Sequence, residues 1–153
     1  MQNVKDEIEF FIKECGSIKY YRKKIEECNE KLEEIATKLE GLSSPTIKEI
    51  IYENARDPYK EKKLYLLEEE RLLIQEKEHW MKSIKYIRSI FKCMPDKKDK
   101  RIIMEMYINK NNRDALATKY FYANHTSLRR YANKKIEEAI KMYHGSLKKD
   151  VKW

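Results

Sequence analysis

The sequence has few of the residues that interrupt helices. Its 153 residues include only three glycines and three prolines, while 39 % of the side chains are charged. Tight turns and hairpin loops draw heavily on glycine and proline, so a chain with so few of them favours long helices over a compact sheet. We therefore expect an all-α protein.

Long hydrophobic runs are also absent. No stretch approaches the ~20 apolar residues that cross a bilayer. The first residues, MQNVKDE, lack the order of charged and then apolar residues that marks a secretory signal. We expect a cytoplasmic protein that makes no membrane contact.

Cysteine is scarce and unpatterned. Cys15, Cys28 and Cys93 are odd in number and widely spaced, and no histidine is placed to complete a zinc site with them. We interpret them as small buried apolar residues. The sequence also lacks a glycine-rich phosphate loop, a nucleophile motif and a carboxylate cluster. We expect no enzymatic activity, no metal and no cofactor.

Charge is distributed unevenly along the chain. Residues 1–94 carry 19 basic and 19 acidic side chains, whereas residues 95–153 carry 15 and 7, so the net charge of +8 comes from the carboxy-terminal segment. Cations confined to one segment form a directed patch that can displace counterions from phosphate, which favours double-stranded DNA as the partner. The alternative is that these lysines only keep helix faces solvated.

The amino-terminal part carries a heptad seam. Its apolar residues alternate between spacings of four and three, which places them along one line of a helix. Only Gly16 interrupts the pattern, at a cost of ~1 kcal/mol in a helix interior. The pattern predicts one helix over 4–42. The seam residues are Ile8, Phe11, Cys15, Ile18, Tyr21, Ile25, Cys28, Leu32, Ile35, Leu39 and Leu42.

Turn and cap signals follow the seam. The segment 41–45 breaks the helix, residues 46–49 have the spacing of a capping box, and a short helix is predicted over 47–54. Asp57 and Pro58 then form a start signal for a second long helix over 59–93.

This second long helix has a wide apolar stripe. The stripe and its flanks comprise Leu66, Leu73, Trp80, Ile84, Ile87 and Phe91, with Leu67, Ile74 and Met81 beside them. Antiparallel packing on the first helix would bury both stripes in one hairpin, and dimerisation in trans would bury them as well. Both arrangements remain open, and we assign residues 1–94 to a helical hairpin or oligomerisation region.

Residues 95–153 are predicted to form a separate basic domain, because Pro95 ends the long helix. Three helices are expected, over 98–108, 113–120 and 126–142. Each has an apolar face, and together these faces could close a small core. The face residues are Ile102, Ile103, Met106, Leu116, Ala117, Tyr120, Leu128, Tyr131, Ala132, Ile136 and Ile140.

The last two of these helices have features of a helix-turn-helix. Ala117 is small enough for the point where the helices cross, and Asn124 suits the N-cap of the third helix, which would enter the major groove. Its first turns offer hydrogen-bonding groups for base edges and cations for phosphates. The candidate DNA-binding residues are Arg113, Lys119, Asn124, His125, Thr126, Ser127, Arg129, Arg130, Asn133 and Lys134.

Within residues 95–142 the chain resembles phage and prophage transcriptional regulators of the ArpU and RinA type. The carboxy-terminal part of that family is similar to the region-four helix-turn-helix of sigma factors. Residues 101–108 match the helix before the motif, and 115–117 with 126–130 match its "I-A … T-V-x-R" frame. The resemblance implies a DNA-binding regulator of phage late genes that could also contact RNA polymerase. The residues themselves support a basic helical module joined to a helical oligomerisation element, and a homodimer through the heptad helices would supply a second half-site.

A different class of function remains as an alternative, a coiled-coil adaptor that binds another protein and carries a degenerate helix-turn-helix. Phe121 stands where the family's turn usually has glycine, and Ser127 stands where a β-branched apolar residue usually enters the core. Either the turn is one residue longer or the motif is degenerate. The tyrosines of this region could stack on single-stranded bases, but their helical spacing favours packing.

Overall fold

The computed structural model describes residues 3–43 and 58–151, and within these ranges it is all-helical, with six α-helices, one π-helical segment and no strand. The expectation of an all-α protein is therefore confirmed. The predicted capping box at 46–49 and the short helix over 47–54 lie outside the described residues. No helix in the described ranges is both long enough and apolar enough to span a bilayer.

The first predicted helix is in fact two helices, α1 (Val4–Gly16) and α2 (Ile18–Ser43). Ser17 leaves helical geometry, with φ −102° and ψ 0°, and its N–H donates to the carbonyl of Glu14 at 3.0 Å. The prediction of a single helix over 4–42 was thus wrong at one residue, Ser17. The seam itself is confirmed, because each of its residues is buried or half-buried.

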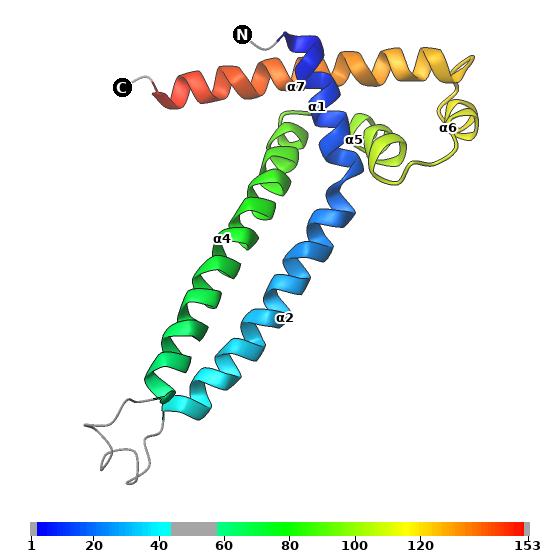
Figure 1. The fold of residues 1–153 in the computed structure, drawn as a ribbon. Coiled ribbons are helices and arrows are strands. Elements are labelled where there is room, and N and C mark those ends of the chain that lie inside the picture. Colours follow the sequence, from blue (N-terminus) through cyan, green and yellow to red (C-terminus); the bar gives the residue numbers. More distant parts are fainter. Residues whose placement is uncertain (1–2, 44–57, 152–153) are drawn as a thin grey trace. The chain divides into compact units, whose positions relative to one another are not determined.

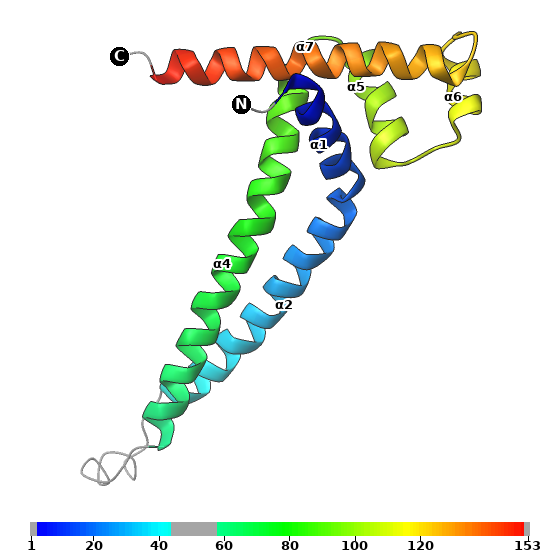
Figure 2. The ribbon, with the colours of Figure 1, turned by 45° about the horizontal axis from the view of Figure 1, so that its top comes forward.

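The chain separates into two compact units. One consists of Arg22–Met81, and it holds most of α2 together with the first part of α4 (Pro58–Lys92). These helices run side by side in opposite directions (Figures 1 and 2). Cys28, Ile35 and Leu66 are each no more than 5 % exposed. This burial stabilises the pair through the hydrophobic effect.

The other unit consists of Met1–Tyr21 and Lys82–Trp153. It differs from the predicted domain of residues 95–153, because α1 and the end of α4 pack with the carboxy-terminal helices. Phe11 and Cys15 are fully buried, and the Phe11 ring lies 5.6 Å from that of Phe91. An amino-terminal helix can pack into a core formed by residues that are distant in the sequence. The charge count that suggested a division after residue 94 carries no information about such packing.

Four elements follow α4, namely α5 (Lys97–Ile103), η1 (Met104–Ile108), α6 (Arg113–Lys119) and α7 (His125–Val151). The residues predicted to face the core do so, since each is buried or half-buried. Two features were not predicted. The wider π-helical turn η1 continues directly from α5, and α7 extends beyond the predicted end at residue 142. Figure 1 shows α6 and the start of α7 joined by a short turn.

Candidate nucleic-acid interface

The turn between α6 and α7 is closed by two backbone hydrogen bonds. The N–H of Tyr122 donates to the carbonyl of Ala117 at 2.8 Å, and the N–H of Phe121 donates to that of Thr118 at 3.2 Å. This is the bonding pattern of a Schellman motif, whose left-handed position is usually glycine. Phe121 occupies that position with φ 64°, and its side chain is 94 % exposed. The backbone therefore takes the conformation of a glycine turn although the residue is phenylalanine.

Asn124 caps the start of α7, as predicted. Its Oδ1 accepts from the N–H of Ser127 at 2.8 Å, and its carbonyl accepts from the N–H of Leu128 at 3.3 Å. Leu128 is completely buried, whereas Ser127 is half-buried. The core position next to the turn is thus filled by Leu128.

Besides Lys119, four of the candidate DNA-binding residues are exposed cations: Arg113 on α6, and Arg129, Arg130 and Lys134 on α7. In the part of the chain that the structure describes, none of the four forms an ion pair. Arg130 and Lys134 lie one turn apart, on the side of α7 away from the buried Ala132. Their charges are therefore available to an external anion.

Arg113 and Arg129 come from different helices and both act on Tyr107. Burial raises the pKa of Tyr107, and the positive charges of Arg113 and Arg129 partly oppose that rise. The fold thus places cations from α6 and α7 around one side chain.

Lys119 is already paired. Its Nζ lies 2.8 Å from Glu105 Oε1, and the Tyr120 hydroxyl donates to Glu105 Oε2 at 2.7 Å. The pKa of Glu105 is lowered, chiefly by the hydrogen bond from Lys119 and then by that from Tyr120. This carboxylate ties η1 to α6. Lys119 must share its charge with it and is a weaker candidate for a phosphate contact than the four unpaired cations.

His125 and Asn133 also have partners within the chain. His125 Nδ1 lies 3.2 Å from Asp114 Oδ1, so the histidine bridges the starts of α6 and α7. Asn133 Oδ1 accepts a hydrogen bond from the Tyr107 hydroxyl at 3.1 Å. Thr126, like Ser127, is half-buried. These side chains hold the turn and the helix in place in the free protein.

Three supporting residues, Glu105, Tyr107 and Asp114, were not predicted from the sequence. Their partners lie 14, 26 and 11 residues away along the chain. No helical periodicity relates residues so far apart across intervening turns. Only the tertiary fold could identify them.

The tyrosines of this region pack within the protein, as expected. The Tyr122 and Tyr131 rings lie 5.6 Å apart, and Tyr143 lies 6.0 Å from Tyr86. The Tyr131 hydroxyl donates to the buried Asp99, and this hydrogen bond, followed by burial, raises the pKa of Tyr131. Their rings contribute to packing and are not arranged as a platform for stacked bases.

The arrangement presents unpaired positive charge that suits a polyanion. In the ranges 3–43 and 58–151, no group of three or more histidine, cysteine, aspartate and glutamate side chains could hold a metal ion. The acidic side chain next on the outer face of α7, Glu137, is paired with Lys141 at 3.1 Å. The first turns of α7 therefore keep their positive charge.

Comparison with known proteins adds no relative. No family model, no curated protein and no solved structure matches this chain. The resemblance to the phage regulators consequently depends only on residues 101–108, 115–117 and 126–130.

Proposed function

We propose that this protein is a sequence-specific double-stranded DNA-binding transcriptional regulator that places the first turns of α7 in the major groove. The observation that carries the proposal is the group of unpaired, exposed cations Arg113, Arg129, Arg130 and Lys134 around the capped start of α7. Phosphate contacts supply most of the affinity of such a site, and groups that reach base edges supply its specificity.

The chemistry of each side chain suggests its role. An arginine guanidinium can donate two hydrogen bonds to the O6 and N7 of guanine, so Arg129 and Arg130 are the base-reading candidates. Arg113 and Lys134 are assigned to phosphates. Thr126 and Ser127, near the helix start where backbone amides point outward, are assigned to a neighbouring phosphate or base edge.

The resemblance adds control of phage late genes and contact with RNA polymerase to the same proposal. A homodimer through the heptad helices is proposed from the heptad seam, and action in the cytoplasm from the lack of a membrane span and a secretory signal in the sequence. A dimer would supply a second half-site, and half-sites of such proteins lie about 34–36 Å apart or at multiples of that distance.

Fluorescence anisotropy with two labelled duplexes tests the proposal. One duplex is the region upstream of the gene, the other is its scrambled sequence, and both are titrated with the full chain at about 150 mM salt, where non-specific contacts are weak. We expect tighter binding to the native duplex. Arg129→Ala with Arg130→Ala should weaken it at least about 30-fold, because each base contact is worth ~1–3 kcal/mol.

A matched control removes two positive charges elsewhere in the same unit. Lys97 and Lys98, on the first turn of α5, are exposed. Lys97→Ala with Lys98→Ala should change affinity only a few-fold. Equal and weak binding to both duplexes, or equal losses in the two double variants, would contradict the proposal.

The protein-binding adaptor is the second candidate, and one observation favours it. Leu67, Ile74 and Met81 repeat every seven residues on α4, and each is at least 40 % exposed. If this function holds, Arg129→Ala with Arg130→Ala leaves partner binding unchanged, whereas Leu67→Gln with Ile74→Gln abolishes it. Pull-down with both double variants separates the two functions.

A further inference from the structure

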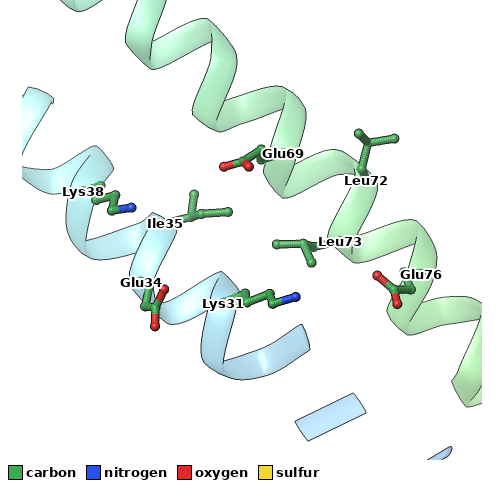
Figure 3. Close-up of a pocket in the computed structure, with 8 residues that line it drawn as sticks. All are labelled: Lys31, Glu34, Ile35, Lys38, Glu69, Leu72, Leu73 and Glu76. Carbon is green, nitrogen blue, oxygen red and sulfur yellow. The ribbon is translucent and has the colours of Figure 1, made fainter. Parts of the chain in front are cut away.

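A hollow of about 450 Å³ lies on one face of the α2–α4 pair in the Arg22–Met81 unit. Figure 3 shows Ile35 of α2 and Leu73 of α4 directed toward each other across its floor. Leu72 of α4 is directed away from α2 and is 51 % exposed. An apolar side chain therefore stands beside a hollow that no described residue of this unit fills.

The two edges of the hollow carry opposite charges. Lys31 and Lys38, seven residues apart, lie on α2, and Glu69 and Glu76, also seven apart, lie on α4. Among the described residues, Lys31, Lys38 and Glu76 make no ion pair. The lysine column of the α2 edge also contains the carboxylate of Glu34, so this edge has a net positive charge, and the α4 edge presents a negative column.

The α2 edge also has the geometry of a hole for a coiled-coil knob. Its four lining residues are Lys31, Glu34, Ile35 and Lys38. They occupy positions i, i+3, i+4 and i+7, the set that surrounds an inserted side chain in knobs-into-holes packing. The side chain of Glu34 is directed away from α4 in Figure 3, so it does not cover the hole.

We propose that a second copy of this chain occupies the hollow, with a two-fold axis parallel to the helices, giving a four-helix bundle. In this arrangement α4 of each copy lies on α2 of the other. Leu72 then enters the hole on the opposite α2, Lys31 faces Glu76, and Lys38 faces Glu69. A two-fold axis across the helices would instead lay α2 on α2 and oppose like charges, so the charge columns select the first symmetry.

The proposal specifies the surface and symmetry of the homodimer and does not depend on DNA binding. It is tested by the mass of the full chain in solution, measured by sedimentation equilibrium at several concentrations. The wild type should be a dimer at about 100 μM, because even a small interface of this kind can give enough affinity for dimerisation at that concentration. A monomer at that concentration overturns the proposal.

Charge exchange tests the symmetry. Lys31→Glu with Lys38→Glu should give a monomer, and so should Glu69→Lys with Glu76→Lys, because like charges then face each other. An equimolar mixture of the two variants should form a heterodimer, and the four-site variant should dimerise as the wild type does. Circular dichroism shows whether each variant keeps its helices. A four-site variant that is folded but monomeric overturns the proposed symmetry.

A paired substitution tests the face without changing charge. Leu72→Gln should weaken dimerisation about 30-fold, because two half-exposed leucines per dimer lose their burial. Ile74→Gln, 41 % exposed on the other flank of α4, is the matched control and should leave the dimer unchanged. The reverse pattern, loss with Ile74→Gln and none with Leu72→Gln, places the contact elsewhere and overturns the proposal.

Discussion

Replacing Phe121 with glycine should make the protein more stable. Phe121 holds φ at 64° in the turn before α7, a region that residues with a Cβ atom enter only at a cost. Its side chain is 94 % exposed, so removing the ring sacrifices almost no buried surface. The two hydrogen bonds that close the turn, from the N–H groups of Phe121 and Tyr122, join backbone atoms only and are therefore kept in the glycine variant.

The expected magnitude is the difference of two terms. A left-handed residue with a Cβ atom costs ~1–2 kcal/mol, which glycine removes. Glycine also gives the unfolded chain more freedom, which costs ~0.4–1 kcal/mol. The net gain is about 0.5–1 kcal/mol. For a chain of this size it should raise the Tm by roughly 1–4 °C.

Thermal unfolding followed by circular dichroism at 222 nm measures this gain. Phe121→Ala is the matched control, because it removes the same ring but keeps the Cβ atom and therefore keeps the strain. It should not rise above the wild type. A Phe121→Gly variant less stable than the wild type, or a Phe121→Ala variant as stable as Phe121→Gly, would refute the argument from backbone strain.

Three further predictions concern the same unit. Asn124→Ala removes the cap of α7 and should lower the free energy of unfolding by ~1 kcal/mol in urea titrations, whereas no loss would mean that water replaces the cap. Glu105 has a lowered pKa, so its stabilising contribution is present above the unfolded pKa of about 4.3 and is lost as pH falls through the folded value. The deficit of Glu105→Gln relative to wild type should therefore shrink between about pH 6 and pH 3, and a constant deficit would contradict this linkage. Burial raises the pKa of the Cys15 thiol to about 12, so iodoacetamide should label the half-buried Cys93 before Cys15 in the folded protein. Peptide mass mapping measures the order of labelling, and labelling of Cys15 before Cys93 would contradict this prediction.

Periodicity predicted most of the fold because it records which side of a helix is buried. The seam from Ile8 to Leu42 and the apolar faces around Ile102, Leu116 and Leu128 are buried or half-buried, as their spacing indicated. The N-cap at Asn124 was readable because its side chain bonds within three residues of itself. Local physics of this kind leaves a local signal in the sequence.

Features that depend on tertiary packing left no such signal. The sequence marked Gly16, next to the break at Ser17, but not its neighbour: a Cβ atom at Gly16 would lie 3.5 Å from Lys110 Cε, on a segment far along the chain. The pairing of Lys119 with Glu105 likewise joins different elements. Composition identified a basic surface, but only the fold separates its unpaired cations from those already neutralised.

The candidate site was therefore predictable as a region but not as a set of roles. Arg113, Arg129, Arg130 and Lys134 remain exposed, as the sequence suggested. The polar candidates around them act in the free protein as caps and bridges. Their part in recognition stays a prediction, since a side chain that holds the turn can still offer its remaining groups to DNA.

The most direct test of DNA reading by α7 is selection from a random duplex library, carried out in parallel with the wild type and with Arg129→Ala/Arg130→Ala. Sequencing of the bound duplexes over successive rounds shows whether one motif rises above the input. We predict a single enriched motif with the wild type and none with the double variant. No enrichment with a folded wild type, or the same motif with both proteins, would contradict the claim that α7 reads DNA through these arginines.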